Sequence, residues 1–478
     1  MTNTKWLRRA LLGGVALGVM AAGAQADELS DLKAQLESLQ GRVNQLEQQP
    51  TMAPLPDGVS FITLSRGSAQ LPNYGTQASR EMGDKPSDRG FTIAVTPTAD
   101  LPAPIAEVVV YGYVKGDVIY DFDKDLGTSF YVPNIWSSTG SDGDHIQLHA
   151  LTSRFGIRSR TDTAIGQIRT QIEGDFWPDA VFDLRHAYGE WDMTPEWTFL
   201  AGQTWSTATL LPIGVSTVDF SSSAGPNAFP RVAQVRMTYH SGPISWAVAA
   251  EAPSYTSSAQ WPNLAAYLQF DAPGGHTFIV TGVVTDADAE FLGVSASELE
   301  NTADRDGVGW AVQAGANINL ADIATLTVGG LYGENGAHCT YLAQHMGCDP
   351  FDANKFERVD FFSDAGWGVL AGLSFGITDT TTFNVQYGIT RLDNDHGAEW
   401  FTGGSWAADH VTTQTVHANI LWRPVQQMQL GWEIMWGQYK FDGGEFGDEV
   451  GCGELEEDIC ASSKDDAIRA QFGAWFFF

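Results

Sequence analysis

The sequence lacks long hydrophobic runs: after residue 26, no stretch of 18 residues is apolar throughout. A transmembrane α-helix needs about 20 predominantly apolar residues, so a helical membrane protein is excluded. Positive charge is scarce as well, because 26 Lys and Arg face 58 Asp and Glu, and the formal net charge is -32. Nucleic-acid binding needs a basic surface, and we therefore expect no nucleic-acid partner.

Cysteine is limited to four residues in two pairs, Cys339 with Cys348 and Cys452 with Cys460. Neither pair has the Cys-x-x-Cys spacing of common zinc sites, although His338 and His345 lie close to the first pair. Disulfide bonds, which exported proteins keep, are the interpretation that we favour over metal binding. We expect no metal site and no cofactor.

Residues 1–26 have the three parts of a secretory signal: a basic start, a short apolar core and a small-x-small cleavage site. The alternative, a transmembrane anchor, would need a longer apolar run. The three parts are Lys5, Arg8 and Arg9, then Leu11 to Val19, then Ala24-Gln25-Ala26.

Residues 27–49 repeat leucine and valine at alternating spacings of three and four, which is typical of a coiled coil. We expect a short periplasmic coiled coil that a trimeric body would help to assemble; the alternative is a lone amphipathic helix. Residues 50–107 are interrupted by proline and are predicted to form an extended linker. Apolar runs within it, such as Val59 to Leu64, leave room for parts that fold onto another element.

From Val108 onward, apolar residues alternate with polar or small ones over segments of about ten residues, the pattern of transmembrane strands. Ile168 and Ile172 share one face of such a segment, and Arg169 and Glu173 share the other. A soluble sandwich would bury the apolar face, whereas a membrane barrel turns it toward lipid. Glycine (51 residues) and aromatic residues (12%) are abundant, as tight turns and aromatic girdles require.

The fold class predicted for residues 108–478 is all-β, a sixteen-stranded antiparallel transmembrane β-barrel. Short connections alternate with long ones, and the even strand count places both termini on the periplasmic side. The long connection 207–230 is expected to fold inward and narrow the channel. The sixteen segments are about 108–122, 147–160, 165–177, 181–192, 196–206, 231–241, 243–251, 263–271, 276–285, 307–320, 323–335, 366–378, 381–392, 412–423, 427–440 and 465–477.

The chain ends on an alternating pattern that stops at Phe478. This ending resembles the C-terminal signature that the barrel-assembly machinery reads, so we expect that machinery as a partner and Phe478 as the assembly signal. The alternating residues are Ile468, Ala470, Phe472, Ala474, Phe476 and Phe478.

Six arginines fall on the predicted lumen face of neighbouring strands. Arginine facing lipid would cost about 2–4 kcal/mol at the midplane of the membrane. A ladder of guanidinium groups on one wall would bind carboxylates and pass anions from site to site. The alternative is that the arginines pair with Glu173, Asp175 and Glu190 and only brace the wall. The six residues are Arg154, Arg158, Arg160, Arg169, Arg185 and Arg236.

The sequence offers no catalytic set. Gly372-Leu373-Ser374-Phe375-Gly376 matches the G-x-S-x-G pattern, but the serine lies within a predicted strand and not at a strand-to-helix turn. Acidic residues crowd the predicted outer loops; they either hold divalent cations at the lipopolysaccharide surface or are simply solvated.

Taken together, these features resemble the DcaP-like outer-membrane porins. The resemblance rests on the order of segments and on four motifs, Tyr111 to Asp117, Ser153 to Arg158, Leu184 to Gly189 and Ala201 to Ser206. It implies a homotrimer in the outer membrane of a Gram-negative bacterium, among lipid and lipopolysaccharide, that passes small anions such as dicarboxylates. The alternatives are a general or cation-preferring porin and, in other classes, an outer-membrane barrel enzyme or an adhesin.

Deleting Asp27 to Gln49 should leave a trimer, because contacts between barrels are expected to supply most of the interface. Heat-modifiable migration in gels, together with the mass of the native complex, would test this. A monomeric product would show that the coiled coil contributes more to trimer stability than the contacts between barrels.

Overall fold

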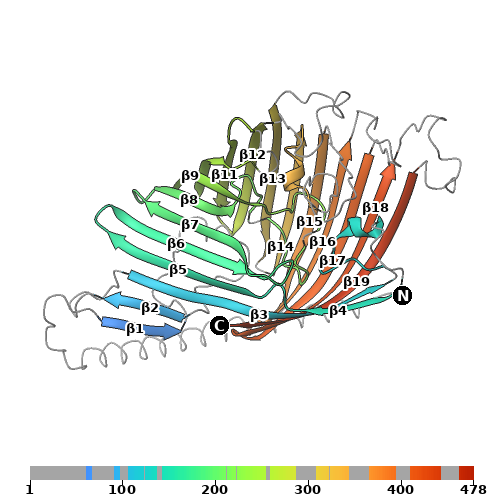
Figure 1. Ribbon diagram of the computed structural model, residues 1–478, viewed down its shortest axis with the longest axis horizontal. Coiled ribbons are helices and arrows are strands. Elements are labelled where there is room, and N and C mark those ends of the chain that lie inside the picture. The colour runs from blue at the N-terminus through green and yellow to red at the C-terminus, as the bar shows by residue number, and fades with distance from the viewer. Residues whose placement is uncertain are drawn as a thin grey trace, which may run out of the picture. The chain divides into compact units, whose positions relative to one another are not determined.

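The computed structural model describes thirteen stretches of the chain, which contain all the strands discussed below (Figure 1). The predicted signal and coiled coil, residues 1–49, lie outside them. The described residues are 61–66, 91–96, 106–122, 124–136, 143–211, 213–221, 223–253, 259–286, 308–321, 323–343, 365–393, 410–442 and 462–478.

Sixteen antiparallel strands form a closed barrel, in which β4 and β5 together make one strand, and the predicted fold class is confirmed. The barrel strands are β3 (Ala106–Phe122), β4 (His145–His149), β5 (Arg154–Thr163), β6 (Gly166–Asp175), β7 (Asp183–Asp192), β8 (Trp197–Trp205), β9 (Arg231–Ser241), β10 (Ile244–Glu251), β11 (Asn263–Ala272), β12 (His276–Asp286), β13 (Val308–Leu320), β14 (Ala324–Glu334), β15 (Ala365–Thr378), β16 (Thr381–Asp393), β17 (His410–Val425), β18 (Met428–Asp442) and β19 (Ser462–Phe477).

The ring closes where the last strand, β19, pairs with the first barrel strand, β3. Their register runs from Ile468 opposite Phe122 to Phe477 opposite Tyr113. A closed barrel satisfies the backbone hydrogen bonds of every strand and leaves no open edge along the barrel wall. Among the described residues, no helix is long and apolar enough to cross a membrane.

The distribution of burial is inverted relative to that of a soluble protein. On β6, Ile168 and Ile172 are 37% and 59% exposed, whereas Arg169, Gln171 and Glu173 are buried. The alternation read from the sequence therefore turns apolar side chains outward and polar ones inward, as a barrel in lipid requires.

One predicted strand, 147–160, is interrupted. Residues 150–153 leave the ladder between β4 and β5, and both parts pair with β3. Ser153 fills the break, because its hydroxyl accepts a hydrogen bond from the Lys115 backbone N–H (3.0 Å). Thr152 and Arg154, at this interruption, line the cavity described below.

Two further strands occur within the segment that was predicted to be an extended linker. β1 (Phe61–Arg66) pairs with β2 (Phe91–Thr96), and β2 pairs with the first residues of β3. The apolar run Val59 to Leu64 overlaps β1. Along one edge of β3, residues 106–110 pair with β2 and residues 113–122 pair with β19.

Removing Phe478 should lower the amount of assembled barrel. Its backbone N–H donates to the Gly112 carbonyl (3.1 Å), which completes the closing ladder, and the terminal pattern predicts that Phe478 is the residue recognised during assembly. The heat-modifiable protein in the outer-membrane fraction would be measured, with Phe478→Tyr as a variant that keeps the ring. Normal levels of the truncated protein would contradict the assembly-signal hypothesis.

Candidate functional site

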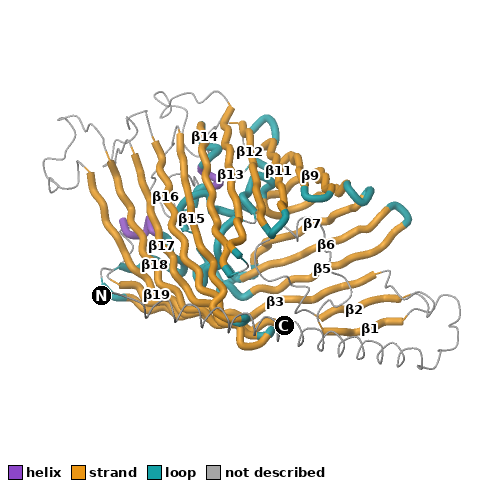
Figure 2. The backbone as a smooth tube through the Cα atoms, turned by 180° about the vertical axis from the view of Figure 1, so that it is seen from behind, coloured by secondary structure: helices purple, strands orange, loops and turns teal. Residues whose placement is uncertain are grey.

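An irregular segment between β8 and β9, residues 206–230, lies within the ring of strands; Figure 2 shows loop segments inside the barrel. Inward side chains of distant strands accept hydrogen bonds from its backbone. Thr207 N donates to Glu251 (2.6 Å), and Val215 N donates to Gln386 (3.0 Å). Glu433 accepts from the N–H groups of both Val218 and Asp219 (2.8 Å for the latter).

Apolar side chains of the same segment fill one side of the lumen. Leu210 and Ile213 are buried against Tyr267, Ile279 and Leu370 on β11, β12 and β15. These close-packed contacts fill space next to strands β10–β15 that would otherwise be open to water.

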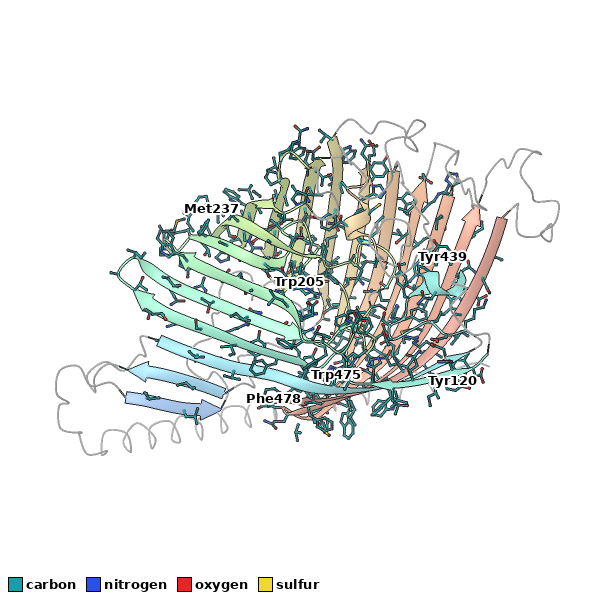
Figure 3. The ribbon with its side chains drawn as sticks, in the orientation of Figure 1. Tyr120, Trp205, Met237, Tyr439, Trp475 and Phe478 are labelled. Carbon is teal, nitrogen blue, oxygen red and sulfur yellow. The ribbon has the colours of Figure 1, made fainter. Side chains whose placement is uncertain are left out.

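A second inward segment, residues 124–136, fills the side next to β17–β19. It contains the short 3₁₀ turn η2 (Val132–Trp136), and Phe130 and Val132 pack on Met435 and Tyr439. Figure 3 shows Tyr439 beside this turn. The two inward segments are joined, since Phe130 N donates to the Asp219 carboxylate (3.0 Å).

The described residues enclose a cavity of about 830 Å³. It lies between the 206–230 segment and strands on both sides of the ring. Trp205 and Trp475, which Figure 3 labels, line it from β8 and β19. Its cationic lining residues are Lys115, Arg154, Arg185, Arg231 and Arg423, and its acidic ones are Glu173, Asp219 and Asp379.

Two of the predicted arginines, Arg154 and Arg185, line this cavity and share two carboxylates. Arg185 donates to Glu173 (3.0 Å) and Asp175 (2.7 Å), and Arg154 lies 3.4 Å from Glu173. Tyr111 also donates to Glu173 (2.8 Å). The two guanidinium charges are thus offset by two carboxylates, so this pair of arginines by itself adds little net charge.

Arg231 is the cavity arginine that the sequence analysis missed. It starts β9, and its guanidinium lies over the Trp205 ring, 4.9 Å from the centroid. Arg185 lies over the same ring at 5.5 Å. Within the described part of the chain, Arg231 forms no ion pair, and Asp175 and Glu173 act on its charge only at longer range.

The remaining predicted arginines lie outside the cavity lining. Arg169 is neutralised by Glu190 (3.2 Å) and by a two-pronged pair with Asp192. Arg160 lies 3.7 Å from Asp162, and Arg158 lies over the Tyr111 ring. Arg236 is 2% exposed. Pairing with acids, which was the alternative interpretation, describes Arg169 well.

Two other cations line the cavity, Lys115 on β3, which pairs with β5, and Arg423 on β17. Lys115 contacts Asp117 (2.8 Å), donates to the Val218 carbonyl (2.6 Å) and lies over Trp475. Arg423 donates to Gln429 (2.6 Å) near the turn between β17 and β18. Lys115 thus holds the 206–230 segment in place, while Arg423 adds a positive charge from β17.

The other candidate sites are the predicted disulfides, the serine of the G-x-S-x-G pattern and possible metal ligands. Cys339 is disulfide-bonded, but Cys348, Cys452 and Cys460 lie outside the described residues, so both pairings stay predictions. Ser374 lies on β15 and donates to Asn384 (2.5 Å). In the described part of the chain, no cluster of His, Cys, Asp and Glu could hold a metal ion.

Comparison with known proteins identifies a family and a fold. Residues 112–466 match the family model described as the porin subfamily. The outer membrane channel DcaP of Acinetobacter baumannii is similar with a TM-score of 0.57 and 21% identity, over 78% of this chain and 97% of that one. OmpT of Vibrio cholerae in its trimer form gives a TM-score of 0.50 and 12% identity, over 78% and 99%. No curated protein sequence matches the chain.

Replacing Gly388 of β16 by alanine should displace the 206–230 segment. A Cβ atom there would overlap the Ala224 carbonyl oxygen, and such overpacking typically costs about 1–3 kcal/mol. Gly330→Ala is the matched control, because its Cβ would have 3.8 Å to the nearest atom. Conductance of single channels and the temperature at which the folded form is lost would be measured. Identical values for the two variants would contradict the close approach.

Proposed function

This chain belongs to the porin subfamily, and from that premise we propose that it lets small anionic solutes, such as dicarboxylates, diffuse through an arginine-lined channel. It is an outer-membrane channel protein and not an enzyme, and its resemblance to the DcaP-like porins is confirmed. The selectivity is the proposed part.

The observation that carries the proposal is that Arg231 lines the cavity and has no ion-pair partner among the described residues. Arg154 and Arg185 already have carboxylate partners, whereas an anion that reaches Arg231 displaces none. A guanidinium stays charged and offers a planar fork that fits carboxylates. The Trp205 ring packs against the Arg231 guanidinium and restrains it, so this side chain loses less conformational entropy when a solute binds.

The strongly negative whole-chain charge is compatible with a locally positive channel. Charges in bulk solvent are screened over roughly 8 Å at physiological salt. Charges in a narrow cavity walled by protein are screened less and act on every ion that passes. The local excess of cations over acids should therefore decide the preference of the channel.

The runner-up is a general or cation-preferring porin. It is favoured by the acids that line the same cavity, Glu173, Asp219 and Asp379, and by the neutralised state of Arg169. In that case the arginines brace the wall and the cavity selects by size alone.

We also propose a homotrimer. It is supported by the heptad pattern of residues 27–49 and by a trimeric structural neighbour of the same fold. Outward apolar residues such as Ile172 and Val248 would contact lipid or a neighbouring barrel.

Arg231→Gln should move the reversal potential in a salt gradient toward cation preference. A unit charge about 8 Å from an ion is worth roughly 2 kcal/mol at an effective dielectric constant of about 20, so the permeability ratio should change by at least about tenfold. Flux of a dicarboxylate should fall more than flux of a neutral sugar. The proposal would be abandoned if the wild-type channel already prefers cations or the variant leaves the potential unmoved.

Arg391→Gln is the matched control for this experiment. It also removes one positive charge, but Arg391 lies on β16 beside Asp393 (2.8 Å) and outside the cavity lining. A comparable shift in both variants would assign the effect to overall charge and not to the cavity.

A further inference from the structure

The connection between β14 and β15 sends a short stretch into the lumen. Residues 339–341 form the 3₁₀ turn η3 (Cys339–Tyr341), and the described chain continues to Ala343. Tyr341 and Leu342 are 2% and 4% exposed and pack with Ala208, Leu331 and Leu392. We call residues 339–343 the clamp segment.

The path of the chain into the lumen depends on a glycine. His338, which precedes the clamp segment, is fully buried. A Cβ atom on Gly366 of β15 would overlap its imidazole ring. Glycine at this position therefore leaves the space through which the clamp segment enters.

The clamp segment holds the first residues of the 206–230 segment through a chain of hydroxyl groups. The Ser206 hydroxyl donates to Glu251 (2.7 Å), so its oxygen is left to accept from the Tyr341 hydroxyl (2.9 Å). Glu251 also accepts from Thr207 N (2.6 Å). Hydrogen bonds in such a buried chain polarise and strengthen one another.

The clamp segment also holds the same segment near its other end. Ala343 N donates to the Gly225 carbonyl (3.0 Å) in an isolated antiparallel bridge. Gly225 N in turn donates to Thr390 of β16 (2.6 Å). Ala343 itself lines the cavity. Five consecutive residues thus contact the 206–230 segment at two positions that are about twenty residues apart in the chain.

We propose that the clamp segment is a second constriction element, which positions the 206–230 segment from both ends and thereby sets the size limit of the channel. Tyr341 is its positioning residue. The proposal rests on the chain being a channel and is independent of which ions the channel prefers.

Tyr341→Phe tests the proposal, because it keeps the buried ring and removes the hydroxyl alone. Single-channel recording would measure the time spent in wider substates, and liposome swelling would measure entry of neutral sugars of increasing size. Wider substates should become about fivefold more frequent, the factor that corresponds to about 1 kcal/mol, the typical net value of a hydrogen bond. Larger sugars should gain more than the smallest one.

Ser206→Ala and the double variant separate positioning from general loosening. Ser206→Ala should have at least the same effect, because it also removes the bond to Glu251, and Tyr341→Phe should add little to it in the double variant, since the bond between the two hydroxyls is already lost. Tyr332→Phe is the control, because it removes an exposed tyrosine hydroxyl that donates to Glu334 (2.8 Å) on the same strand, β14. It should behave as wild type.

The proposal would be overturned if Tyr341→Phe matched wild type in substates and size profile, or if the two single effects added fully. A shifted reversal potential without a changed size profile would also count against it. A wild-type channel that prefers cations would contradict the selectivity proposed above but would leave this test unaffected.

Discussion

The architecture of the lumen depends on satisfying the backbone of a segment that has no regular structure. Residues 206–230 lie where most water is excluded, and each unpaired N–H there would cost free energy. Side chains of Glu251, Gln386, Thr415 and Glu433 supply the acceptors from four different strands. The polar side chains on the inner face of the barrel therefore have two roles. They hold the 206–230 segment, which shapes the cavity, and they line the space that water fills.

The arginines of the barrel wall fall into two groups, those paired with carboxylates and those without such a partner in the described residues. Arg169 and Arg185 are held between carboxylates, whose negative charges offset the charges of the two guanidinium groups. Arg231 lies over an aromatic ring and forms no ion pair in the described residues, so its hydrogen-bond donors remain available to a solute. This division cannot be read from the amino-acid composition, because the register between neighbouring strands decides which arginine lies beside an acid.

The strands could be predicted because their period of two is long and regular, as between Ile168 and Ile172. The break around Ser153 and the inward course of residues 337–343 were not predictable, since each depends on partners far away in sequence, such as Lys115 and Ser206. Arg231 escaped notice because it starts a strand after a long connection and shares no alternation with the other arginines. The contact of Lys115 with the Val218 carbonyl was not predictable either, because the two residues lie 103 positions apart in the sequence.

Closure of the ring between β3 and β19 has a consequence for biogenesis. The two partners lie more than 300 residues apart, so the final ladder cannot form until the last residues of the chain have been made and exported. Until then, both terminal strands present unpaired edges, which invite aggregation. Folding dominated by such distant contacts is intrinsically slow. The chain must therefore be kept soluble in the periplasm for the whole interval between export and closure.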